Sequence, residues 1–166
     1  MRKWLSDPDW RIVQRRVPIA CVDVLPLRRR TSGSTQVGLI YRQTPHQGRR
    51  WCLIGGRLFR NEPLQTAVIR QVKEALGSKA RCVLNGPVQP LLVVEYLSRR
   101  RKGSLFDPRQ HAVSLTFSVQ VSGRAKPAGE ALDFRWFNLE DLPSSKLFGF
   151  GQKKVVLECA RRLWAR

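Results

Sequence analysis

The chain has 166 residues, and 42% of them are hydrophobic, which is enough for one domain with a substantial buried core. Its 31 Lys and Arg residues outnumber 12 Asp and Glu residues, giving a formal net charge of +19. A field of that sign attracts phosphates, nucleotides and nucleic acids alike, so the charge narrows the class of partner without choosing within it. No apolar run reaches the roughly 20 residues of a membrane-spanning helix, and the amino-terminal residues lack the apolar centre of a signal peptide. We therefore expect a cytoplasmic protein.

The first half of the chain predicts one short helix and then three strands. The helix is amphipathic and covers residues 6–15. The strands are expected at residues 17–27, 36–42 and 51–54, and the third ends at the paired glycines Gly55 and Gly56.

Residues 56–77 predict a loop and then a second helix. Apolar side chains recur every four residues, at Leu64, Val68, Val72 and Leu76. This period is typical of a helix with one buried stripe. Asn61 or Glu62 can cap the helix, with Pro63 in its first turn, and Gly77 ends it. Arg70 and Glu74 are four residues apart, so they share a face away from the buried stripe.

The second half predicts four more strands and a closing helix. The strands are expected at residues 81–84, 90–97, 111–121 and 132–137, and the helix at residues 152–164. Strands mixed with helices in this order indicate an α/β fold with a mixed β-sheet. Because no internal repeat or linker interrupts the sequence, we expect one domain over residues 1–166.

The helix and the loop before it match a known motif. Residues 56–77, GRLFRNEPLQTAVIRQVKEALG, resemble the Nudix box, and the matching positions are Gly56, Glu62, Arg70, Val72, Glu74 and Gly77. The resemblance implies an α/β/α sandwich and hydrolysis of a nucleoside diphosphate linked to another moiety. It also implies Mg²⁺ or Mn²⁺ near Gly56 and Glu74, catalytic roles for Arg70 and Glu74, and structural roles for Glu62 and Gly77.

Three positions depart from the family pattern. Gln71 and Ala75 stand where the Nudix box has glutamates, and Ser78 stands where it has an apolar residue. One carboxylate of the usual three remains on the helix, so we expect weak metal binding until substrate phosphates complete the shell. The same departures favour an alternative, a nucleotide-binding module that kept the fold and lost turnover. Arg70 and Glu74 would then be an ordinary surface pair, worth roughly 0.3–0.5 kcal/mol.

Other segments resemble one branch of the family, the GDP-mannose mannosyl hydrolases. The matching stretches are DPDWRIVQRRVPIACVDVL, WCLIGGR and RWFNLEDLP. That branch implies a nucleotide sugar as substrate, His111 as a catalytic base and Arg57 on the substrate. Arg42 and Arg57 can each hold a diphosphate, although either can equally be a surface charge. The branch is dimeric, and Trp4 and Trp10 need a cover, so we expect a homodimer unless these residues pack on their own sheet.

Several side chains have two possible interpretations. His111 can equally be a histidine at a strand edge with no catalytic role. Glu95 interrupts an apolar strand, so we expect it to have a partner, which is either a structural ion pair or a substitute metal ligand. The arginine runs at residues 28–30 and 99–102 lie in polar loops, where they are either solvated charge or contacts to RNA or polyphosphate. That second reading supports a further alternative, a nucleic-acid-binding protein.

The four cysteines, Cys21, Cys52, Cys82 and Cys159, are widely separated and form no C-x-x-C pair. The spacing gives no sign of a zinc or redox site. We expect them to be buried, reduced thiols.

Overall fold

The computed structural model describes residues 5–84 and 88–164. Its strands are β1 (Ile19–Arg29), β2 (Thr35–Thr44), β3 (Gly48–Cys52), β4 (Ile54–Arg57), β5 (Ala80–Val83), β6 (Leu92–Leu97), β7 (Leu105–Phe106), β8 (Ala112–Gly123) and β9 (Asp133–Phe137). Its helices are α1 (Asp7–Arg16), α2 (Leu64–Leu76) and α3 (Lys153–Trp164). Two 3₁₀ turns, η1 (Ser145–Leu147) and η2 (Gly149–Gly151), lie directly before α3.

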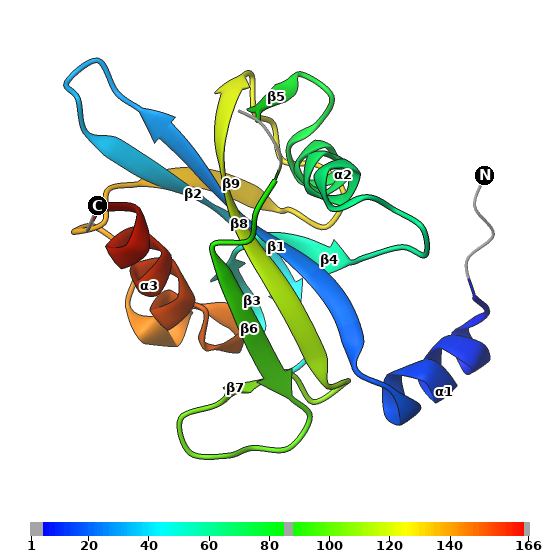
Figure 1. Ribbon diagram of the computed structural model, residues 1–166. Helices are drawn as coiled ribbons and strands as arrows, with labels where there is room; N and C mark the ends of the chain where they lie inside the picture. The colour runs from blue at the N-terminus through cyan, green and yellow to red at the C-terminus, as the bar shows by residue number, and fades with distance from the viewer. Residues whose placement is uncertain (1–4, 85–87, 165–166) are drawn as a thin grey trace.

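The strands form one mixed sheet (Figure 1). Six of them follow the order β3-β2-β1-β8-β6-β7, while β4 pairs with β1, β5 with β8 and β9 with β2. The pairs β1–β8 and β6–β7 are parallel, and the others are antiparallel. One edge of β1 serves two partners in turn, because residues 21–24 pair with β4 and residues 27–29 pair with β2. The segment that joins β3 to β4 therefore crosses the place where the sheet divides.

Two apolar layers cover the sheet, as the alternation of β1 shows. Val22 and Val24 belong to the cluster that packs under α2, and Leu25 and Leu27 belong to the cluster that packs under α3. Figure 1 shows α2 and α3 on opposite sides of the sheet and α1 beyond the start of β1. The predicted α/β/α sandwich with a mixed β-sheet is confirmed. None of the described helices is long and apolar enough to cross a bilayer.

Most predicted elements are present with ends shifted by a few residues, and one strand is divided. Residues 51–54 were expected as a single strand, but β3 ends at Cys52 and β4 begins at Ile54. The backbone N–H of Leu53 donates to Oε1 of Gln152 at 2.9 Å, so it takes no part in the sheet ladder. β7 has two residues, too few to show a period, and was not predicted.

The start of α2 differs from the prediction in its cap. Pro63 occupies the N-cap position and makes no side-chain cap, so a cap from Asn61 or Glu62 is wrong. Asn61 has a φ of 61° and lies in the turn before the helix. Gly77 ends the helix, as expected.

Glu62 is instead the partner of Arg70. Nε of Arg70 donates to Oε1 of Glu62 at 2.7 Å, and Nη2 donates to Oε2 at 2.9 Å. The Glu62 side chain is only 3% exposed, and it also accepts from the Phe59 N–H at 3.0 Å. Nη2 of Arg70 reaches the carbonyl oxygen of Arg57 at 2.9 Å. The hydrogen bonds that Arg70 donates to Glu62 raise the pKa of Arg70, and the pair joins the loop, β4 and α2.

A second polar network crosses the core on the α3 side of the sheet. The hydroxyl of Tyr96 donates to Oδ2 of Asp23 at 3.1 Å, and Nε2 of Gln152 donates to the Tyr96 oxygen at 3.0 Å. Asp23 is 8% exposed, and burial raises its pKa even though Ser114 and Tyr96 act in the opposite direction. Through Gln152, the network also holds the division between β3 and β4.

The cysteine prediction is right in part. All four thiols are free, but only Cys52 and Cys159 are buried, whereas Cys21 and Cys82 are half-buried. Burial raises the pKa of Cys21 and of Cys52 to about 12, so both are protonated at neutral pH.

Removing the carboxylate of Glu62 tests the first network. Glu62→Ala leaves the Arg70 guanidinium, which is largely buried, without its main partner, and the free energy of unfolding should fall by about 3 kcal/mol or more. Urea unfolding measures the loss. Glu158→Ala is the control, because Glu158 pairs with Arg161 and Arg162 on an exposed helix face and should matter far less. Equal losses would contradict this role for Glu62.

Asp23→Asn tests the second network through pH. Because the pKa of Asp23 is higher in the folded chain than in the unfolded chain, the unfolded state loses a proton first as the pH rises. The free energy of unfolding then falls until the folded carboxyl also ionises. Asparagine removes this contribution, so melting temperatures should show the variant gaining stability relative to the parent over the range of rising pH that begins at about pH 4, the ordinary pKa of an aspartate. The exposed Asp141→Asn serves as control, and a constant difference across this range would show that Asp23 is ionised throughout.

Candidate functional site

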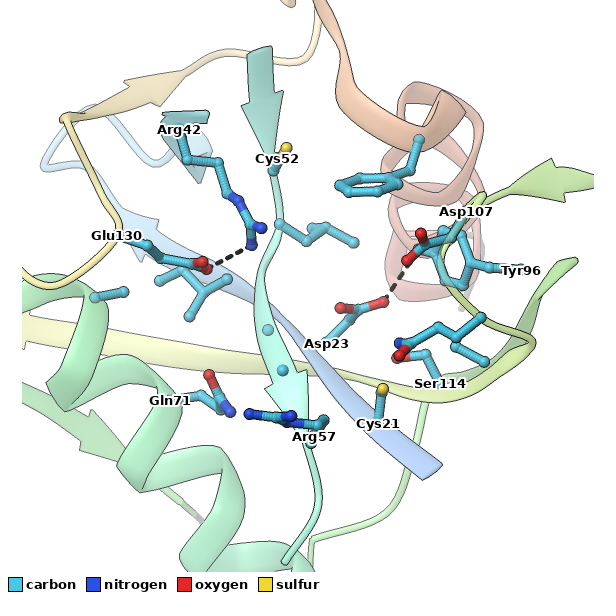
Figure 2. A pocket seen from close by; sticks show the side chains of 18 of the residues that line it. Cys21, Asp23, Arg42, Cys52, Arg57, Gln71, Tyr96, Asp107, Ser114 and Glu130 are labelled. Atoms are coloured by element: carbon cyan, nitrogen blue, oxygen red, sulfur yellow. Dashed lines mark hydrogen bonds and ion pairs between the residues drawn. The ribbon is translucent and has the colours of Figure 1, made fainter. Parts of the chain in front are cut away.

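A cavity of about 720 Å³ opens where the sheet divides, between α2 and β1. One wall is the segment of residues 52–57, which carries the paired glycines. Figure 2 shows Glu130, Arg42 and Gln71 to one side of this segment and Asp23, Tyr96 and Ser114 to the other. A volume of this size is typical of sites for small organic ligands.

The paired glycines let two polar side chains come close to the backbone. A Cβ on Gly55 would overlap Oδ1 of Asp23, and a Cβ on Gly56 would lie 2.6 Å from Nε2 of Gln71. Glycine is therefore required at Gly55, where the obstacle includes the backbone of β1. At Gly56 the obstacle is the end of a longer side chain.

The face of α2 toward the cavity carries one carboxylate. Glu74 is 57% exposed, lines the cavity and accepts from Nη1 of Arg70 at 3.1 Å. Gln71 and Ala75 line the same wall and supply an amide and a methyl group. No group of three or more His, Cys, Asp or Glu side chains among residues 5–84 and 88–164 is placed to hold a metal ion. These donors do not fit a divalent-cation site made by the protein alone.

Three arginines line the cavity away from α2. Arg42 forms an ion pair with Glu130, and Arg109 donates to both oxygens of Asp107 at 3.0 and 2.7 Å. The guanidinium of Arg57 lies 4.2 Å from the centre of the Trp10 ring. Burial lowers the pKa of Arg57. Burial also acts to lower the pKa of Arg109, but the hydrogen bonds to Asp107 and the charges of Asp107 and Glu130 together outweigh it, and the pKa is raised. The cavity is thus rich in donors that suit a diphosphate.

The deep end of the cavity is polar but uncharged for the most part. Ser114 is 1% exposed, and its hydroxyl makes no hydrogen bond of normal geometry among the described residues. It nevertheless lies close enough to Asp23 to lower the pKa of that carboxyl. With Tyr96 and Gln152 beside them, these groups can accept from or donate to a neutral polar part of a ligand.

The structure brings five of the predicted residues to this cavity. They are Arg42, Gly56, Arg57, Arg70 and Glu74. Glu62 and Gly77 hold the box from outside it, as described above.

His111 and Glu95 lie elsewhere. Neither lines the cavity; they pair with each other, Nε2 to Oε1 at 2.8 Å, with side chains 35% and 58% exposed. The partner expected for Glu95 is His111, and the pair is exposed, because Tyr96 is the residue of β6 that points inward and Glu95 faces the opposite way. The geometry therefore gives no support to His111 as a base or to Glu95 as a metal ligand at this site.

Asp107, Arg109 and Glu130 are among the charged residues of the cavity that sequence reasoning missed. Asp107 and Arg109 follow the short β7, and Glu130 lies in an irregular loop, so no hydrophobic period marks them. The loop reaches the site because the N–H of Ala128 donates to the carbonyl oxygen of Ala75 at 2.9 Å. No local sequence signal indicates that contact.

A family model described as "Domain of unknown function (DUF4916)" matches residues 1–157. An ADP-ribose pyrophosphatase of Methanocaldococcus jannaschii is 32% identical over 112 residues, which are 67% of this chain and 57% of that protein. The chain thus matches just over half the length of that relative.

Two solved structures are similar in fold. A possible asymmetric diadenosine tetraphosphate hydrolase from Jonesia denitrificans is 29% identical, with a TM-score of 0.77 and coverage of 89% of this chain and 95% of that one. The NUDIX domain of Shewanella oneidensis NrtR, solved with ADP ribose, is 19% identical, with a TM-score of 0.65 and coverage of 96% and 99%. The box residues, the divided sheet and these matches agree. The chain therefore belongs to the DUF4916 family and is a member of the Nudix superfamily, whose fold it has.

Proposed function

We propose that this chain hydrolyses a nucleoside diphosphate linked to another moiety, with the reacting bond held in the 720 Å³ cavity. The observation that carries the proposal is the meeting of Glu74, on the box helix, with Arg42, Arg57 and Arg109 around one space. The named relatives support it, since one is an ADP-ribose pyrophosphatase and one NUDIX domain was solved with ADP ribose.

The arginines act on the diphosphate. A guanidinium can bind two phosphate oxygens at once, and three of them around one cavity neutralise the charge that develops on the leaving phosphate. Arg42 and Arg109 are already oriented by Glu130 and Asp107, so binding costs little reordering of their side chains. Substrate phosphates then compete with these carboxylates for the same donors.

The other moiety of the substrate fits the deep end of the cavity. Ser114, Asp23 and Tyr96 offer hydrogen-bonding groups, and burial favours the neutral form of Asp23 by raising its pKa. A sugar hydroxyl matches that chemistry, which supports a nucleotide sugar or ADP-ribose-like compound. The GDP-mannose mannosyl hydrolase branch remains a prediction.

Dependence on Mg²⁺ or Mn²⁺ is also part of the proposal. Because the donors on α2 do not make a site by themselves, a metal ion would have to arrive with the phosphates and use Glu74 as a protein ligand. Glu130 lies on the cavity wall, where burial raises its pKa and the charge of the nearby Glu74 adds to that shift, and it is the candidate for a second carboxylate.

A specific observation favours the alternative of a binding module. Gln71 is buried against Gly56, and Ala75 is buried beside it, so the wall that carries glutamates in the Nudix box is filled and neutral here. Such a wall can bind a nucleotide without turning it over. The substitutions below separate these two functions.

Assembly and location extend the proposal. Leu5, just before α1, and Ile12, within it, are 44% and 54% exposed, and no residue of that helix is buried, which supports a homodimer through this helix. Trp10 instead contacts Arg57, and Trp4 lies outside the described residues. A cytoplasmic, single-domain protein remains our expectation, and nucleic acid remains a less favoured partner suggested by charge.

Glu74→Gln should lower hydrolysis by about 10²-fold or more, because it removes the one carboxylate on this face of α2 while keeping its size. Phosphate release is measured over a panel of nucleotide sugars, ADP-ribose, dinucleoside polyphosphates and nucleoside triphosphates with Mg²⁺ and Mn²⁺. Glu140→Gln, in an exposed turn, is the control and should keep full activity. If no compound is turned over by the parent but one binds, the binding module is the correct function.

Restoring carboxylates tests the metal argument. Gln71→Glu with Ala75→Glu adds two oxygen ligands beside Glu74, so Mn²⁺ affinity without substrate should rise by about tenfold or more. Calorimetric titration measures it, with Lys73→Glu as control because Lys73 is exposed and does not line the cavity. Unchanged affinity in the double variant would show that this face of α2 no longer takes part in metal binding.

A further inference from the structure

A second cavity, of about 360 Å³, shares Phe150 with the first. Its walls come from the residue 46–47 turn, β7 and the loop before it, and the start of α3. Phe150 lines both cavities and has a backbone φ of 55°, a value that residues other than glycine rarely adopt. The backbone is held in this form by the Phe150 N–H, which donates to Oε1 of Gln47 at 2.7 Å.

The lining of this second cavity is cationic. Arg100, Lys153 and Lys154 line it, and no Asp or Glu does. The two ammonium groups donate to the carbonyl oxygens of Pro143 and Gly103, at 2.8 and 2.6 Å, which are neutral partners that leave the charges in place. The Arg100 guanidinium lies 4.3 Å from the centre of the Phe106 ring and has no ion pair within the described part of the chain.

His46 adds a ring nitrogen that has no hydrogen-bond partner among the described residues. Its ring meets Phe106 and Phe150 edge-on, with centroids 5.2 and 5.7 Å away. This nitrogen, Nδ1, is buried. Burial lowers the pKa of His46, and Asp107, whose charge acts against that shift, is already held by Arg109. The ring can therefore donate or accept beside the three cations.

We infer that this second cavity binds a phosphate or diphosphate group. Three cations with no carboxylate among the lining residues favour a compact anion of high charge, and hydroxyl groups of Ser104 and Ser145 on the same walls suit phosphate oxygens. The group belongs either to the far end of a substrate in the first cavity, reaching past Phe150, or to a separate small anion. The inference does not depend on turnover in the first cavity.

The test is a titration of the full chain with inorganic pyrophosphate, followed by ¹H–¹⁵N NMR at fixed ionic strength. The amide signals of Ser104 and Gly151 report the second cavity, and those of Gly55 and Gly56 report the first. The Ser104 and Gly151 signals should shift and saturate as pyrophosphate is added. In Arg100→Glu with Lys154→Glu, the affinity that they report should fall by about tenfold or more, while the Gly55 and Gly56 signals titrate nearly as before.

Arg99→Glu with Arg101→Glu is the matched control, since it makes the same change of charge in the same basic loop at side chains that do not line the cavity. It should weaken binding at Ser104 and Gly151 by less than about threefold. Equal weakening in the two double variants, or no saturable shift in the parent, would overturn the inference, because bulk charge would then explain any attraction. The spectra themselves show whether each variant is folded.

Two ligands distinguish the source of the phosphate. If diadenosine tetraphosphate displaces pyrophosphate from the second cavity and ADP-ribose does not, the group is the far end of a long substrate. If neither displaces it, the cavity takes a separate anion. Both results support a phosphate site, and a failure of hydrolysis in the first cavity affects neither.

Discussion

Arg70 is the side chain on which the arrangement of the site depends. Its guanidinium binds both oxygens of Glu62 and the carbonyl oxygen of Arg57, and it also reaches Glu74. One planar group with five donors thereby fixes the loop, the end of β4 and the helix relative to one another. Glu74 and Arg57 face the same cavity because each is tied to this guanidinium. The Nudix box of this chain thus keeps the contacts of Arg70, although Gln71 and Ala75 replace two of its glutamates.

The loss of those glutamates changes the charge balance of the cavity. Gln71 and Ala75 make the helix wall neutral, whereas Arg42, Arg57 and Arg109 remain on the other walls. The helix wall therefore adds little negative charge to oppose an anion, and the carboxylates of Asp107 and Glu130 pair with two of the arginines. The second cavity is also positively charged, because Arg100, Lys153 and Lys154 line it and no Asp or Glu does.

The sequence predicts the regular parts of this structure well and the irregular parts poorly. The four-residue period of the box helix and the alternation of β1 follow directly from burial, so their positions could be predicted. His111 shows the limit: its neighbours Gln110 and Ala112 line the cavity and it does not, and a difference of one residue decides the face. Glu130 reaches the site only through the docking of its loop on α2, a long-range contact without a local signal.

The central claim is that oriented arginines of this cavity hold a diphosphate, and ADP-ribose binding measured by calorimetry tests it most directly. Arg42→Gln should weaken binding by about tenfold or more, because Arg42 lines the cavity and its hydrogen bonds to phosphate oxygens are charge-assisted. Arg49→Gln removes the same charge from the same β2–β3 hairpin at an exposed side chain, and it should weaken binding by less than about threefold. Equal effects of the two substitutions would contradict the claim, since the net charge rather than the cavity would then attract the ligand.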